Sequence, residues 1–218
     1  KGDSEIELPE DASARLLLSE AARRIDDKLP GQQVEGTVLQ LIEDIDISSM
    51  SEEMRKVVLV AIAHVKHAWH ISRENWSEAS DLRESLGSIS HVNDPQLVAM
   101  NLRAEIAQTS CNSPSFDKLI EQAFSHNGLR AKMLQISLLE RCDGERAKSI
   151  LKRIEIPSAE SQTNMTSARR VSAMIWYHRA IFKTHNPLSA MAEAISLWKR
   201  SLCPAAARDA TQLMHKML

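Results

Sequence analysis

Apolar residues recur at intervals of three or four over most of this chain, and polar residues fill the positions between them. The clearest example is a stripe that shares one helical face and consists of Val58, Ile62, Val65 and Trp69. A second stripe of the same spacing consists of Phe116, Leu119, Ile120 and Ala123. Because alternating strand patterns and turn glycines are scarce, we predict an all-α chain.

Prolines, glycines and polar residues divide this pattern into helix-length segments. The predicted helices cover about 11–28, 33–44, 52–73, 77–86, 129–141, 144–154, 168–184 and 188–202, and three more begin near Pro95, Pro114 and Pro204. The polar stretch 157–167 is predicted to be an exposed loop.

Capping residues mark several ends of these helices. Ser49 and Glu52 have the spacing of a capping box before the helix at 52. Asp94 and Ser113 each precede a proline, the combination expected at a helix start. Gly87 stands where a left-handed residue would close the helix 77–86.

The helices come in pairs of a longer and a shorter helix, and the long ones begin near 52, 95, 129 and 168. The short helices share a related order of packing residues that begins with a small one, seen in Ala147, Leu151, Ile154 and in Ala190, Ala194, Leu197. This order resembles the tetratricopeptide repeat (TPR) superfamily over about 52–202, although Arg83 replaces an apolar residue and the period is uneven. The resemblance implies stacked antiparallel hairpins in a right-handed α-solenoid that binds peptides or partner domains.

Two parts of the chain are distinguished by their sequence. Residues 1–50 form an acidic helical segment whose apolar stripe is Leu16, Leu17, Ala21 and Ile25, and we expect this segment to pack as a cap on the first hairpin. Residues 51–218 are predicted to be the helical-repeat domain, and the helix that begins at Pro204 closes it.

Charge is divided unevenly along the chain. Residues 1–125 hold 12 basic and 22 acidic side chains, whereas residues 126–218 hold 15 basic and 7 acidic ones. Such asymmetry influences the choice of partner more than the fold. The two charges could complement each other between neighbouring repeats, form ordinary solvated faces, or leave the basic half for an anionic partner.

The cysteines and the hydropathy of the chain indicate the cellular compartment in which the protein is expected. Cys111, Cys142 and Cys203 are odd in number and lack CxxC spacing, so we expect neither a disulfide framework nor a zinc site. This favours a reducing intracellular compartment, cytoplasmic or nuclear. The longest apolar run, 57–65, is too short to span a bilayer, so no membrane partner is predicted.

Three histidines, His64, His67 and His70, lie away from the apolar stripe of the helix 52–73 and are predicted to face solvent or a groove. They diverge too far around the helix to share one metal ion, so they are not predicted to be metal ligands. We treat His64 as a candidate partner contact, together with Lys132 on a later helix.

The helix 168–184 carries the main candidate site. Its predicted buried face consists of Val171, Met174, Ile175, His178, Ile181 and Phe182. Ser172, Trp176, Arg179 and Lys183 fall well away from that face, and Arg169 lies at its edge. A tryptophan beside two cations is typical of an interface hot spot. Alternatively, Trp176 packs on a neighbouring hairpin and the cations are solvated.

The sequence contains no phosphate-binding loop and no recognisable nucleophile or metal-ligand motif. We therefore expect no enzyme activity, catalytic residue, metal or cofactor. The predicted function is a protein-protein interaction module or scaffold that binds a partner protein or peptide of acidic character. The alternative is nucleic-acid binding through the basic C-terminal half, which would need a continuous basic groove with stacking aromatic residues.

Overall fold

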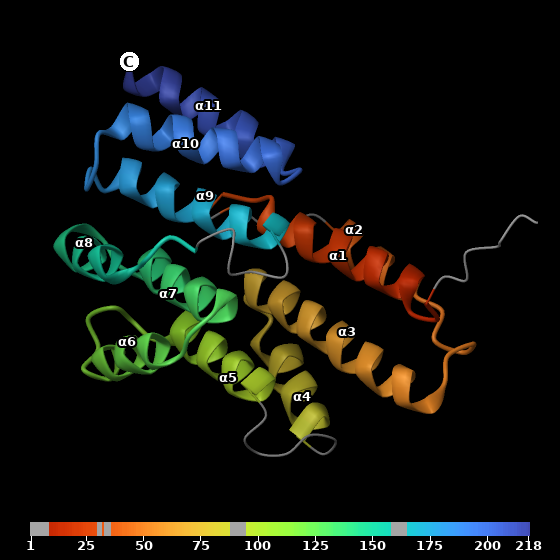
Figure 1. Ribbon diagram of the computed structural model, residues 1–218. Coiled ribbons are helices and arrows are strands. Elements are labelled where there is room, and N and C mark those ends of the chain that lie inside the picture. Colours follow the sequence, from red (N-terminus) through yellow and green to blue (C-terminus); the bar gives the residue numbers. More distant parts are fainter. Residues whose placement is uncertain (1–8, 30–31, 33–35, 88–94, 158–164) are drawn as a thin grey trace, which may run out of the picture. The chain divides into compact units, whose positions relative to one another are not determined.

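The computed structural model describes residues 9–29, 32, 36–87, 95–157 and 165–218, and all regular elements in these ranges are α-helices (Figure 1). The predicted all-α class is therefore confirmed. The predicted cap at Asp94 lies outside the described residues, as does most of the predicted loop 157–167.

The chain forms two compact units. Unit 1 consists of Lys1–Ile25 and Gln33–Ile89, and unit 2 consists of Asp26–Gln32 and Ser90–Leu218. A short segment near the N-terminus thus belongs to the C-terminal unit. The boundary predicted at residue 50 falls inside unit 1.

Most of unit 1 is built from four helices. These are α1 (Ala12–Asp26), whose last residue belongs to unit 2, α2 (Thr37–Glu43), α3 (Glu52–Ser72) and α4 (Trp76–Gly87). One apolar cluster joins α1, α2 and α3 through Ala21, Val38, Ile42 and Trp69. A second contains Ala14, Ile45, Met50 and Val58. The helices of the acidic N-terminal segment therefore pack on α3, the first long helix, and their role as a cap on a hairpin stack stays a prediction.

The buried face of α1 differs from the predicted stripe. Leu16 is 72% exposed, whereas Ala14 and Ala21 are buried. Leu18 and Ile25, four residues beyond Ala14 and Ala21 respectively, are partly buried and complete this face. Leu16 lies about 200° around the helix from Ala14, so it points away from the face that α1 buries.

The start of α3 and its histidines also correct the sequence interpretation. Ser51, and not Ser49, caps α3, because its hydroxyl oxygen accepts a hydrogen bond from the Met54 amide at 3.4 Å. His67 is fully buried, so the prediction that it faces solvent or a groove was wrong, whereas His64 and His70 are half-buried. The reason is that α3 is covered over a wider arc than its apolar stripe.

Unit 2 contains seven helices in its described part: α5 (Pro95–Gln108), α6 (Ser115–Ser125), α7 (Leu129–Arg141), α8 (Gly144–Arg153), α9 (Met165–Ile181), α10 (Pro187–Arg200) and α11 (Pro204–Met217). The successive long helices pack together, α5 on α7 and α7 on α9, and each contacts the shorter helix that follows it. Figure 1 shows α9, α10 and α11 side by side.

The core of unit 2 is a single cluster that reaches from Leu102 on α5 to Ala210 on α11. The predicted stripe on α6 is buried at all four positions. Small residues occupy many buried positions of α10 and α11, namely Ala190, Ala194, Ala206, Ala207 and Ala210, which are all at most 3% exposed. The two triplets of packing residues at α8 and α10 thus occupy buried positions, except that Leu197 is only partly buried.

The last long helix differs from prediction at both ends. Helix α9 starts at Met165 and ends at Ile181, three residues earlier than predicted at each end. Ser172, which was predicted to lie away from the core, is buried, whereas Ile181 is 39% exposed. The buried arc of α9 is therefore rotated toward Ser172, because neighbours on more than one side cover this helix.

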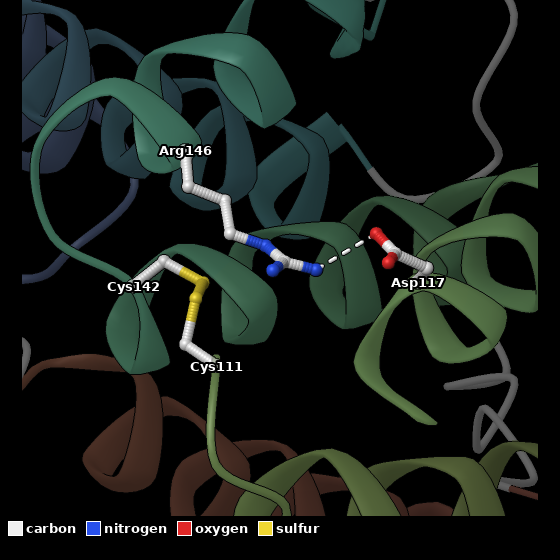
Figure 2. The surroundings of a disulfide bond; sticks show 4 residues. All are labelled: Cys111, Asp117, Cys142 and Arg146. Atoms are coloured by element: carbon white, nitrogen blue, oxygen red, sulfur yellow. Dashed lines mark hydrogen bonds and ion pairs between the residues drawn. A yellow bond between two sulfur atoms is a disulfide. The ribbon is translucent and has the colours of Figure 1, made fainter. Parts of the chain in front are cut away.

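A disulfide bond joins Cys111 to Cys142, which contradicts the expectation drawn from the odd cysteine count (Figure 2). Their Cα atoms lie 5.4 Å apart, a normal separation for a disulfide. Each cysteine follows a long helix, α5 or α7, and the packing of these two helices on each other brings the two positions together. Cys203 is a buried free thiol. The cysteines therefore no longer support a reducing compartment.

Candidate interaction surface

The C-terminal end of α9 carries a contact between aromatic and cationic side chains. The guanidinium of Arg179 lies 4.8 Å from the ring centre of Trp176, within the range of a cation–π interaction. The ring of His185 meets the same indole edge-on, with 5.5 Å between ring centres. Arg179 also donates a long hydrogen bond of 3.5 Å to the Ile154 carbonyl oxygen. Partial burial lowers the pKa of Arg179.

Trp176 has features of both alternatives that the sequence left open. Its side chain is half-buried and packs against the core of unit 2, as the structural alternative required. Its ring is also covered by Arg179, which is itself only half-buried. A change at Trp176 would therefore disturb packing and surface together, whereas a change at Arg179 acts mainly on the surface.

Lys183 does not lie on the helical face where the sequence placed it. It is exposed and follows the end of α9, with a left-handed φ of 52°. Two bonds form a Schellman turn here, from the Lys183 amide to the Ala180 carbonyl and from the Thr184 amide to the Arg179 carbonyl. The turn displaces Lys183 from the helical line of Trp176 and Arg179.

The remaining predicted contacts are spread over other helices. Arg169 is half-buried on α9, two turns before Trp176, and Lys132 is half-buried on α7. His64 is half-buried on α3 in unit 1. The candidate interaction surface in unit 2 is defined here as Trp176, Arg179, Lys183 and His185.

Part of the positive charge of unit 2 is compensated by carboxylates of the same unit. Arg146 on α8 forms an ion pair of 2.8 Å with Asp117 on α6 (Figure 2). Its guanidinium also lies 5.1 Å from the ring centre of Phe116. Arg153 pairs with Glu121 at 2.9 Å and lowers the pKa of that carboxyl group. These contacts agree with one of the three alternatives left open by the sequence, namely that acidic and basic residues of neighbouring helices complement each other.

Sequence reasoning missed a second set of polar contacts, made by the segment Asp26–Gln32, which we call the strap. Asp26 pairs with Arg170 on α9 at 3.3 Å. Burial raises the pKa of Asp26, and the attraction of Arg170 opposes this shift. The only signal in the sequence was two adjacent aspartates at the end of a helix, which do not reveal what they bind.

Other residues of the strap contact α11, the last helix of unit 2. The Asp27 carboxylate accepts a hydrogen bond of 3.0 Å from the Ala206 amide in the first turn of α11. This position suits a carboxylate, because the first amides of a helix have no partner within the helix. Leu29 is buried in the core cluster. The side-chain amide of Gln32 donates a hydrogen bond of 3.0 Å to the Asp209 carboxylate.

A shallow hollow of about 380 Å³ lies along α10 and α11. Its lining includes two exposed cations, Lys199 and Arg208, beside Pro204 and Ala207. Arg208 lies 3.6 Å from Asp209, so part of its charge is compensated.

Among the described residues, no group of three or more histidine, cysteine or acidic side chains is placed to hold a metal ion. In the same part of the chain, none of the helices combines the length and the apolar character that crossing a membrane requires. Comparison of the chain with protein-family models, with curated proteins and with solved structures gives no significant match.

Proposed function

We propose that this chain is a non-catalytic protein-interaction module in which unit 2 is a TPR-like, right-handed stack of helical hairpins. The packing of α5 on α7 and of α7 on α9 supports this arrangement, because successive first helices of a hairpin stack contact one another. Each of these helices is followed by a shorter helix that packs on it. Stacks of this kind bind partners along an extended surface.

The observation that carries the proposal is the candidate interaction surface at the end of α9. It offers an indole, a guanidinium at 4.8 Å from it, and an exposed ammonium in the following turn. Tryptophan and arginine are the residues most enriched in interface hot spots, since they combine large contact area with directional hydrogen bonds. The charge of Arg179 and Lys183 favours an acidic segment of a partner protein.

The arginine pairs between α6 and α8 favour a protein partner over nucleic acid. Binding along a phosphate backbone needs cations in a continuous row. Here Arg146 and Arg153 already bind carboxylates of α6, so acidic side chains interrupt the basic surface of unit 2. A partner that presents a few carboxylates at one place fits such a segmented surface better.

The test is capture of partners from an extract of the source cells by the tagged full chain, with and without nuclease. Arg179→Glu combined with Lys183→Glu reverses two charges and leaves Trp176 packed against the core of unit 2, although it removes the cation–π contact. For a true hot spot, binding of the captured protein should weaken by about 2 kcal/mol or more. Lys118→Glu, a charge reversal at an exposed position on α6, is the matched control and should bind normally.

Three outcomes are informative. Loss of capture with an unchanged melting temperature supports the surface at the end of α9. Normal capture by the doubly reversed variant contradicts it and moves attention to Lys132 and His64. Capture that nuclease abolishes would show that the basic half binds nucleic acid and that the proposed protein partner is wrong.

A further inference from the structure

The strap is held in unit 2 although the chain on both sides of it belongs to unit 1. Its contacts join residues that are far apart in sequence: Asp26 to Arg170 across 144 residues, and Asp27 to Ala206 across 179. The helices of residues 90–218 therefore bind a short acidic segment that precedes them in the sequence and is separated from them by unit 1 residues. The contacts are those of peptide recognition.

Arg170 shows that this place is built to hold a carboxylate. Its side chain is only 8% exposed, and its Nη1 atom is directed at Asp26. The Nε atom of the same guanidinium is buried and makes no hydrogen bond in the described structure. Buried arginines are normally satisfied by carboxylates that take both edges of the guanidinium. The single contact of 3.3 Å therefore uses less of this group than a bidentate ligand would.

Other groups around Arg170 make the site specific for a particular order of acidic and apolar side chains. The amide of Ala206 receives the second carboxylate, and an apolar position in the core receives Leu29. Arg103 on α5 supplies a further positive charge that attracts Asp26. A ligand with two adjacent carboxylates, followed two residues later by an apolar side chain, matches all of these positions.

We propose that the strap fills, within its own chain, a binding site for acidic peptides of the pattern Asp-Asp-x-Leu, and that such a segment of a partner protein displaces the strap. This inference rests on the proposed function, since it names the chemistry of the partner. A second copy of this chain carries the same residues and is the other source of that chemistry. Binding at this site is competitive, because ligand and strap need Arg170 and the Ala206 amide.

The test uses a fluorescent synthetic peptide with the sequence of residues 22–33, titrated into the full chain. Asp26→Asn with Asp27→Asn removes the charge of the strap while keeping its shape, and this variant should bind the peptide at least tenfold more tightly than the unaltered protein. Adding Arg170→Gln to the variant should abolish the gain. Lys199→Gln, which removes a cation of the hollow on α10 and α11, is the matched control and should change nothing.

A peptide in which both aspartates are replaced by asparagine should fail to bind any form. Hydrogen exchange on the unaltered protein provides a measurement that needs no variant. Excess peptide should speed exchange of the strap amides and leave α6 and α8 unchanged. If folded protein shows neither tighter binding in the variant nor faster exchange of the strap, the inference is wrong. Binding that does not depend on Arg170 would also overturn it.

The outcome is separable from that of the proposed function. If the peptide does not bind while partner capture depends on Arg179 and Lys183, the proposed interaction module is supported and the strap has only a structural role. If the peptide binds while the Arg179 and Lys183 variant captures partners normally, the strap site stands and the surface at the end of α9 is wrong. A dimer that the Asp26 and Asp27 variant loses would support the site and identify a second copy as its ligand.

Discussion

Unit 1 and unit 2 are both made of amphipathic helices, yet they bury their apolar residues in different ways. In unit 2, one cluster connects α5 to α11 and includes the fully buried Trp198. In unit 1, two separate apolar clusters contain four buried residues each, and many of their neighbours are only partly buried. Similar helical periodicity in the sequence therefore leads to unequal depth of packing.

Side-chain size explains much of this difference. Five alanines of α10 and α11 are at most 3% exposed, so the packing of these helices leaves little apolar surface in water at those positions. In unit 1, the long helix α3 leaves Val57 59% exposed and Leu59 40% exposed, so part of its apolar surface stays in contact with solvent. Because stability grows with the apolar area removed from water, we expect unit 1 to be the less stable of the two.

Trp198 and Trp69 provide the largest test of this comparison. Trp198→Ala should lower the free energy of unfolding of unit 2 by about 4–5 kcal/mol, and Trp69→Ala should lower that of unit 1 by about 3 kcal/mol. The reason is that a rigid continuous core collapses less around a cavity than a small cluster does. Urea unfolding followed by tryptophan fluorescence measures both. A larger loss for Trp69 would contradict the ranking.

The disulfide should stabilise unit 2 alone. It joins residues 31 apart, and closing a loop of this length restricts the unfolded chain by about 3–4 kcal/mol. Cys111→Ser with Cys142→Ser should therefore lower the urea midpoint of the unit 2 transition. Hydrogen exchange of α3 amides, which report on unit 1, serves as the control. Equal effects on both units would show that the chain unfolds as one.

Acid should weaken unit 2 through His178. Burial lowers the pKa of this histidine to about 4, from 6.5 in the unfolded chain. As pH falls from 6.5 to 4, the unfolded state gains a proton that the folded state does not take up, so stability falls by up to about 3 kcal/mol. The loss is absent above pH 6.5. His178→Leu should flatten this part of the pH profile, and an unchanged slope would contradict the assignment.

The sequence was enough to predict the individual helices, but it predicted few of the contacts between segments that are distant in the chain. The stripe on α6 and the bounds of α3 and α7 follow from helical periodicity, which depends only on neighbouring residues. Trp176 and Arg179 could likewise be paired from their spacing of three. The disulfide and the strap could not, because they join distant segments that only the packed helices bring together.

Helix ends show a similar limit. The sequence placed a left-handed cap at Gly87, whereas Glu74, Lys183 and Leu202 all have left-handed backbones although none is glycine. Each of these residues follows the end of a helix, α3, α9 or α10, in a turn closed by paired backbone bonds. Periodicity and the usual preference for glycine do not identify such turns, because tertiary packing compensates for the strain.

These turns provide the smallest test of the comparison between units. The left-handed conformation costs a residue with a Cβ atom about 1–2 kcal/mol, and replacement by glycine removes this cost. Part of the resulting stabilisation is lost, because glycine gives the unfolded chain more conformational entropy. Glu74→Gly should therefore stabilise unit 1, and Leu202→Gly unit 2, each by about 0.5–1 kcal/mol. Leu202 is 70% exposed, so the loss of its side chain removes little packing. Leu202→Ala keeps the Cβ atom and should give no gain. If glycine raised the stability of both units equally from either position, the separation of the two units would be wrong.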